Sequence, residues 1–226
     1  ASEHLIAKGW AAQIQIGQTG SGLEAGAHFE RVLEREPDNL TAMIGLGGFH
    51  AMRAVTFTAD DPDEALAKAE WLLSRAIARN PYASLAHHFL GLVHKVRGEP
   101  RAALACLDRA IAINPSLAPA YGAAATLYSR MGRDQEGLDH ALYALRLSPR
   151  DPSAGLWWLF AGNIQLEMGR DDEAIACVRT SVTLNPIGPW GLVSLAGMLA
   201  LRGEVEEVPR AVPEKSESEG IHKVFE

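Results

Sequence analysis

Eight histidines are the side chains of this sequence with the greatest capacity for metal binding or proton transfer. His87 and His94 are seven residues apart, so on one helix they would share a face with about 10 Å between them. One ion with ligand bonds of about 2 Å cannot join side chains at that separation. His87 and His88 are adjacent and would point to different faces of a helix. We therefore expect structural histidines and no metal site.

The two cysteines give neither a disulfide framework nor a zinc-ligand set. Cys106 and Cys177 lie two units apart in the repeat described below, with two helical hairpins between them. That separation exceeds the limit of about 7 Å between the Cα atoms of a disulfide. We expect two free thiols and a reducing, cytoplasmic compartment.

Other combinations that carry catalysis are missing from the sequence. It contains no nucleophile elbow, phosphate-binding glycine loop or metal-ligand motif, and Gly20-Ser21-Gly22 follows no strand. Asp134, Asp171 and Asp172 follow glycine turns, which favours helix caps over a catalytic pair. We expect no enzyme activity, no catalytic residue and no cofactor.

Composition narrows the class of partner. Apolar residues make up 47% of the 226 residues, which is typical of a folded protein. The net charge of −7 argues against a nucleic-acid binder and against an anionic membrane surface. The longest apolar run, Trp190–Leu201, is shorter than the roughly 20 residues of a membrane span. No signal-peptide pattern opens the chain, and its first residue, Ala1, is consistent with a fragment or a processed form.

Two sets of helix-ending residues recur along the chain. Prolines recur with separations of 34, 34 and 37 residues at Pro81, Pro115, Pro149 and Pro186. Glycines recur independently with separations of 34, 37 and 34 residues at Gly98, Gly132, Gly169 and Gly203. A glycine can adopt the left-handed conformation that ends a helix, and a proline prevents the next helix from continuing. The pattern predicts helix, glycine turn, helix, proline turn, with roughly 12–14 residues in each helix.

Small residues recur where the two helices of each hairpin would touch. With the proline at position 32, units begin at Ser84, Ala118 and Gly155. The recurring residues are Gly91, Ala125 and Gly162 at position 8; Ala103, Gly137 and Ala174 at position 20; Ala110, Ala144 and Ser181 at position 27; and the larger His87, Tyr121 and Trp158 at position 4. This pattern resembles the tetratricopeptide repeat. The resemblance implies an all-α, right-handed superhelical array of helix–turn–helix hairpins.

The pattern extends over most of the chain and predicts about five repeats with a partial sixth. The expected units are 6–39, 40–83 with a ten-residue insertion, 84–117, 118–151, 155–188 and a partial unit 189–203, followed by an acidic tail, 204–226, as an irregular cap or linker. The insertion falls around VTFTADDPDE, where Asp61 as N-cap, Pro62 and Glu64 predict a helix start.

A closer resemblance concerns the segments AINPSLAPAYGAAATLYSRMGRDQEGLDHALYALRLSPRDPSAGLWW and GNIQLEMGRDDEAIACVRTSVTLNPIGPWGLVSLAGMLALRG. They are similar to the repeat region C-terminal to class III adenylate cyclase domains of alphaproteobacteria, which winged-helix regulators also carry. The resemblance implies a regulatory or sensory module of a bacterial signalling protein. Neither a cyclase catalytic domain nor a winged helix is recognisable in this chain.

In such arrays, positions 2, 5, 9 and 12 of each first helix line the concave face, where partners usually bind. We predict a peptide-binding groove formed by His88, Leu92, Lys95, Thr126, Arg130, Leu159, Asn163 and Val193. This mainly apolar face with a few polar groups favours an extended or helical peptide with apolar anchors. The alternative is that much of the face packs against neighbouring first helices.

Two further interpretations concern tryptophans and the C-terminal end. Trp157 and Trp158 are expected to be core residues rather than a binding site. Trp190, Val193 and Leu199 lie on a final helix without a complete polar capping helix, which favours homo-oligomerisation as an alternative function. A third hypothesis places the terminal segment GIHKVFE in a groove of the same or a neighbouring chain.

Overall fold

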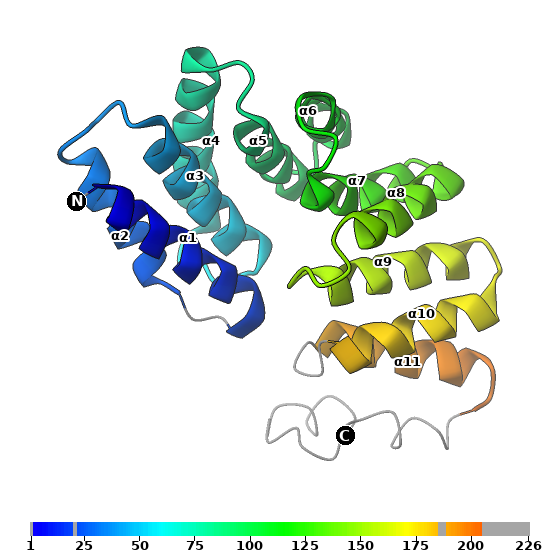
Figure 1. Ribbon diagram of the computed structural model, residues 1–226. Coiled ribbons are helices and arrows are strands. Elements are labelled where there is room, and N and C mark those ends of the chain that lie inside the picture. Colours follow the sequence, from blue (N-terminus) through cyan, green and yellow to red (C-terminus); the bar gives the residue numbers. More distant parts are fainter. Residues whose placement is uncertain (1, 20–21, 185–188, 205–226) are drawn as a thin grey trace. The chain divides into compact units, whose positions relative to one another are not determined.

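The computed structural model (Figure 1) describes residues 2–19, 22–184 and 189–204 of the chain. All regular secondary structure in this part is helical, which confirms the predicted all-α class. The helices are α1 (Ser2–Thr19), α2 (Glu24–Leu33), α3 (Leu40–Val55), α4 (Pro62–Arg79), α5 (Ser84–Val96), α6 (Pro100–Ile113), α7 (Ala118–Arg130), α8 (Asp134–Leu147), α9 (Ala154–Glu167), α10 (Asp171–Leu184) and α11 (Pro189–Leu201). None of the helices in these ranges is both long and apolar enough to cross a bilayer.

The chain divides into two compact units between Leu127 and Tyr128, inside α7. In the first unit α1 packs on α2, α3 on α4 and α5 on α6, and α3 also contacts α5. In the second unit α9 packs on α8 and α10, and α11 packs on α10 and α9 (Figure 1). Consecutive helical hairpins therefore pack on one another within each unit.

The glycine turns have the conformation that the spacing predicts. The φ angles of Gly98, Gly132, Gly169 and Gly203 are +75°, +73°, +72° and +78°. These values lie in the left-handed region, which a residue without a Cβ atom enters at little cost. Gly20 lies outside the described residues, and Gly22, just before α2, has a φ of +102°.

The proline turns also follow from local sterics. Helices α4, α6 and α8 each end two residues before a proline. The residue directly before each proline, Asn80, Asn114 or Ser148, has an extended φ of −137°, −131° or −143°. The proline ring disfavours helical geometry in its predecessor, so the helix stops there. Pro186 lies outside the described residues.

Glycine at position 8 allows the two helices of a hairpin to approach closely. A Cβ atom added to Gly91 would lie 2.8 Å from Leu107 Cγ, and one added to Gly162 would lie 2.5 Å from Val178 Cγ2. The same Cβ atom at Gly162 would be 2.9 Å from the backbone oxygen of Ala174, a residue that is itself fully buried. Only a hydrogen atom fits between these helices.

In the units that begin at Ser84 and Ala118, position 4 carries a ring whose polar atom contacts the preceding proline turn. Nε2 of His87 lies 3.0 Å from the carbonyl oxygen of Pro81, and the hydroxyl of Tyr121 donates to the carbonyl of Pro115 at 3.2 Å. The same kind of polar contact therefore links the start of α5 to the Pro81 turn and the start of α7 to the Pro115 turn. His87 is thus a structural residue, as its spacing from His94 predicts.

The tryptophan pair divides between two environments. Trp157 is buried, and Trp158 is half-buried. The stripe that begins at Trp157 continues through the buried Ile164, on a helix that packs against both α8 and α10. The interpretation of Trp157 as a core residue is confirmed.

The predicted insertion lengthens two helices as well as the loop between them. Compared with α5 and α6, α3 is three residues longer, α4 is four residues longer, and the connecting loop is three residues longer. Asp61 is the N-cap of α4, and its side chain accepts a hydrogen bond from the backbone N–H of Glu64 at 3.0 Å. Pro62 occupies the first turn, so the predicted helix start is confirmed.

The expectation that Asp134 caps a helix is wrong. Arg133 occupies the N-cap position of α8 without a capping side-chain bond, and Asp134 is the first helical residue. The carboxylate of Asp134 accepts a hydrogen bond from the Ser129 hydroxyl at 2.6 Å, which ties the end of α7 to the start of α8. Asp172 lies in the first turn of α10 and forms an ion pair with Arg202. These carboxylates still have structural roles, because they also lie near the positive ends of helix dipoles.

We predict that Gly162→Ala destabilises the protein by about 1–3 kcal/mol, because the added methyl group would overlap Val178 and the Ala174 carbonyl. The matched control is Gly197→Ala in α11, where no described atom lies within 4 Å of the added Cβ. That change should stabilise the protein by about 0.5–1 kcal/mol through helix propensity. Urea denaturation followed by circular dichroism measures both. Equal effects of the two substitutions would contradict the close approach at Gly162.

Candidate functional site

In the first unit, two of the predicted groove residues lie in the interior. His88 is 5% exposed, with its ring 5.1 Å from that of Phe89, and Leu92 is also buried. Burial, reinforced by the charge of Lys95, lowers the pKa of His88 to about 4. Nδ1 of His88 is buried without a hydrogen-bond partner among the described residues. The neutral ring is therefore part of the packing at this point of α5.

Lys95 and Thr126 form a polar link between α5 and α7. The ammonium group of Lys95 donates to the Thr126 hydroxyl at 2.6 Å and to the carbonyl of Ala123 at 3.5 Å. Both side chains are half-buried. The structure thus brings these two predicted site residues together, with the Lys95 ammonium group as donor and the Thr126 hydroxyl as acceptor.

In the second unit, the predicted residues differ in their accessibility. Leu159 is buried in a core that includes Val178 and Leu195 from the two following helices. Asn163 and Arg130 are exposed, and Val193 is 47% exposed. The structure therefore leaves Asn163 and Val193 open to solvent and encloses Leu159.

Asn163 is joined directly to the last helix. Its Oδ1 accepts a hydrogen bond from the Ser194 hydroxyl at 2.6 Å, which places this part of α9 beside this part of α11. The amide nitrogen of Asn163 forms no hydrogen bond with the described part of the chain and can donate two. The bond to Ser194 orients the amide so that these donors are available.

Exposed apolar side chains flank this amide on both helices. Leu156 precedes Asn163 by seven residues, and Trp190 precedes Ser194 by four, so each shares a helix face with its polar partner. Leu156 is 41% exposed and Trp190 is 65% exposed. We define the α9–α11 face as the surface formed by Leu156, Asn163, Trp190, Val193, Ser194 and Gly197.

The predicted groove does not include Leu156, and Trp190 is predicted only as part of an oligomerisation surface. Both are the second residue of a first helix in the repeat numbering. The rule that assigns position 2 to the concave face was therefore the signal that could have found them.

His50, His94 and the two cysteines have structural surroundings. Burial, together with the charges of Lys68 and Arg53, lowers the pKa of His50 to about 4. Nδ1 of His94 lies 2.6 Å from a carboxylate oxygen of Glu99. Both cysteines are free, and burial raises the pKa of each thiol. Among the described residues no three His, Cys, Asp or Glu side chains converge as metal ligands.

Comparison with known families supports the repeat assignment. The sequence pattern of the tetratricopeptide repeat matches residues 158–187, which cover most of α9 and all of α10. Together with the helical hairpins and the similar solved structures, this match supports a tetratricopeptide-repeat protein. No curated protein matches the chain in sequence.

Several solved structures have the same fold. The tetratricopeptide-repeat protein TTC0263 of Thermus thermophilus is 20% identical, with a TM-score of 0.67 over 88% of this chain and 100% of that one. The pilF protein of Pseudomonas aeruginosa is 20% identical, with a TM-score of 0.66 over 78% of this chain and 75% of that one. The human IFIT1 dimer with m7Gppp-AAAA is 19% identical, with a TM-score of 0.76 over 93% of this chain and 49% of that one. At these identities the likeness concerns the fold alone.

We predict that His88 makes stability depend on pH. Its ordinary pKa of 6.5 applies to the unfolded chain, and the folded pKa is about 4. The unfolded chain therefore binds more protons between these values, so stability is full above pH 6.5 and falls as the pH approaches 4. In His88→Leu the loss between neutral pH and pH 4 should be smaller by up to roughly 3 kcal/mol, at about 1.4 kcal/mol for each pKa unit.

Urea denaturation at both pH values measures this difference. His4→Gln, on the exposed surface of α1, is the control and should lose as much stability as the unmodified protein. If His88→Leu shows the same pH dependence as this control, the buried imidazole does not titrate as described.

Proposed function

We propose that this chain is a non-catalytic protein-interaction scaffold that binds a peptide or a partner helix on its concave face. The α9–α11 face is the part of that surface best suited to binding. The observation that carries the proposal is the pairing of exposed Trp190 and Val193 with an amide that Ser194 holds in place. Aromatic anchors contribute strongly to binding energy, and a fixed amide can pair with a peptide backbone.

The chemistry of this face favours an apolar ligand. Leu156, Trp190 and Val193 supply exposed apolar area, and Asn163 supplies hydrogen-bond donors without charge. A ligand with two or three apolar side chains on one side and free backbone carbonyls would satisfy both. Within the second unit, Leu159 would support this face from the interior and Arg130 would provide a polar contact. Within the first unit, His88 and Leu92 would support the concave side of α5 from the interior, and Lys95 and Thr126 would provide its polar groups.

We further propose a regulatory role in a bacterial, cytoplasmic signalling protein. This rests on the resemblance to repeat regions beside class III adenylate cyclase domains and in winged-helix regulators. The similar structures from Thermus thermophilus and Pseudomonas aeruginosa show that the fold occurs in bacteria. The human IFIT1 dimer was solved with m7Gppp-AAAA, but the net charge of −7 disfavours a nucleic-acid ligand for this chain.

Peptide selection tests the proposed groove. A random peptide library displayed on phage, selected against the purified protein, should yield peptides with regularly spaced large apolar residues. Trp190→Ala should weaken their binding about tenfold or more, because it removes an aromatic anchor. Asn163→Ala should weaken it several-fold through the lost donors.

Tyr82→Ala removes an exposed aromatic side chain from the first unit and is the matched control. Calorimetric titration with the selected peptides should give an unchanged affinity for this variant. Binding that is insensitive to both Trp190→Ala and Asn163→Ala would exclude the α9–α11 face as the site.

Homo-oligomerisation is the second candidate function, and the exposed side of α11 favours it. Leu201 is 80% exposed and Trp190 is also exposed on this helix. The expectation that Leu199 belongs to this surface is wrong, because Leu199 is fully buried in the core against α9 and α10. The proposed interface would therefore consist of Trp190, Val193 and Leu201. The tail 205–226, including GIHKVFE, lies outside the described residues.

If the chain self-associates through α11, Leu201→Glu should shift it to monomers, since a charge would be buried in an apolar interface. Sedimentation velocity over a range of concentrations measures the shift. Because this interface shares Trp190 and Val193 with the α9–α11 face, self-association and peptide binding should compete, and the substitution should not weaken binding of the selected peptides. A chain that is monomeric at every concentration before substitution would exclude this candidate.

A further inference from the structure

Five helices of the described chain end with the same pair of backbone hydrogen bonds. After α5, the N–H of Gly98 donates to the carbonyl of Lys95 at 3.2 Å, and the N–H of Glu99 donates to that of His94 at 2.9 Å. This pair defines a Schellman motif, in which the residue after the C-cap adopts the left-handed conformation. Helices α3, α7, α9 and α11 end with the equivalent two bonds.

The residue at the left-handed position is glycine in four of these five caps. They are Gly98, Gly132, Gly169 and Gly203. In the cap of α3 the position is occupied by Phe57, with a φ of +57°. The N–H of Phe57 donates to Ala54, and that of Thr58 donates to Arg53 at 2.9 Å, so the hydrogen bonding matches the glycine caps. Phe57 is the one residue other than glycine with positive φ in the described chain.

The phenylalanine at this position adds no packing to the protein. An L-residue with a bulky side chain is strained in the left-handed region, because its Cβ atom crowds the backbone. The side chain of Phe57 is 83% exposed, so it buries almost no apolar area in return. Residues held in unfavourable backbone conformations concentrate at functional sites, which motivates a search for a role.

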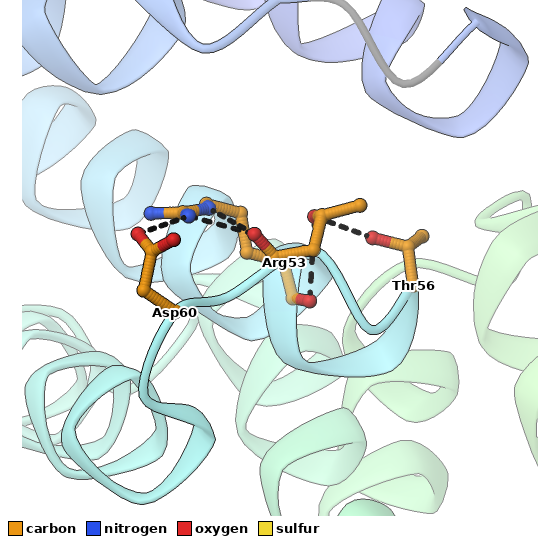
Figure 2. A network of polar contacts seen from close by, with 4 residues as sticks. Arg53, Thr56 and Asp60 are labelled. Atoms are coloured by element: carbon orange, nitrogen blue, oxygen red, sulfur yellow. Dashed lines mark hydrogen bonds and ion pairs between the residues drawn. The ribbon is translucent and has the colours of Figure 1, made fainter.

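The surrounding loop holds this backbone conformation firmly. Arg53 donates to the carbonyl of Thr58 through Nε at 3.2 Å and Nη2 at 2.7 Å, and to Asp60 at 3.0 Å. The hydroxyl of Thr56 bonds to the carbonyl of Met52 at 2.9 Å and lies 3.0 Å from the hydroxyl of Thr58. Figure 2 shows this network enclosing the turn between α3 and α4. The phenyl ring therefore projects from a rigid loop, so little conformational entropy remains to be lost on binding.

Acidic residues follow Phe57 closely in the sequence. Asp60, Asp61, Asp63 and Glu64 follow it within seven residues, and all four are exposed. Arg53 pairs with Asp60, and Lys68 pairs with Glu64 at 2.7 Å. No described ion pair neutralises Asp61 or Asp63, so negative charge remains on the segment that follows Phe57. A surface that matches this chemistry has an apolar pocket bordered by lysine or arginine.

We propose that Phe57 is the apolar anchor of a second interaction surface, which docks into a basic-rimmed apolar pocket of another folded protein. This surface belongs to the first unit and does not depend on the α9–α11 face. A second copy of the chain is disfavoured as the partner, because the acidic loop would approach a chain with a net charge of −7. The loop is therefore a protruding recognition element that the repeat carries at the cost of a strained cap.

Substitutions at position 57 separate the role of the ring from that of the cap. Phe57→Gly and Phe57→Asn should fold with an unfolding midpoint equal to or above that of the unmodified protein, because both residues tolerate the left-handed conformation. Gly98→Ala, at the equivalent position after α5, should lower the midpoint. A clear loss of stability in Phe57→Gly would show that the ring serves the fold, and it would overturn the proposal.

Site-specific crosslinking identifies the partner. The photoreactive residue benzoylphenylalanine at position 57, in cells of the source organism, should give one discrete crosslinked product with another protein. The same residue at position 82, where Tyr82 is also exposed, is the control and should not give that product. A product of twice the chain mass would assign the surface to self-association and would overturn the proposed partner class.

The partner that crosslinking identifies is then purified, and its affinity for this chain is measured. Its affinity should fall about tenfold or more with Phe57→Gly, and Phe57→Tyr should restore it to within a few-fold of the original value. Affinity should also decrease with increasing salt, because the acidic loop faces a basic rim. Trp190→Ala should leave this affinity unchanged, because Trp190 belongs to the α9–α11 face. The Phe57 surface and the peptide groove are therefore tested separately. Equal binding by Phe57→Gly and the unmodified protein would overturn the proposal.

Discussion

The close approach of paired helices is the constraint on which the rest of this structure depends. Where α9 crosses α10, a single added carbon at Gly162 would lie 2.9 Å from a backbone oxygen of Ala174. The same restriction recurs at Gly91 against Leu107. Because interiors are packed as densely as crystals, a contact of this kind sets the separation of the two helices. The hairpins α5–α6 and α9–α10 therefore share the same close approach of their two helices.

The helix ends are a second constraint, and here local chemistry is sufficient. Among the described helix ends, five caps share one hydrogen-bond pattern, and four of them use glycine because the geometry requires a positive φ. At Phe57 the same hydrogen bonds form around a residue that the geometry disfavours. Glycine occupies the left-handed position in the other four caps, so Phe57 stands out as the exception. Its unfavourable conformation is maintained by a polar network around Arg53. The binding surfaces of the array can thus include its turns as well as its helix faces.

Accessibility along the first helices depends on what packs next to them. His88, Leu159 and Val193 occupy the same position of three repeats, but the first two are buried and the third is 47% exposed. Leu159 is covered by α10 and α11, whereas no later first helix packs on α11 within the described residues. A first helix on which no later described helix packs therefore exposes positions that are enclosed in the repeats before it. This explains why Trp190 and Val193 on α11 are accessible.

Local spacing in the sequence was sufficient to predict the helices, the glycine and proline turns, the cap at Asp61 and the buried Trp157. These features depend on backbone sterics and short-range hydrogen bonds, which nearby residues determine. The predicted groove mixed buried residues such as His88 with open ones such as Asn163, because repeat position specifies a face but not what covers it. The bond between Asn163 and Ser194 and the exposure of Phe57 likewise emerged only in three dimensions. Tertiary structure decided these points because burial depends on contacts between residues distant in the chain.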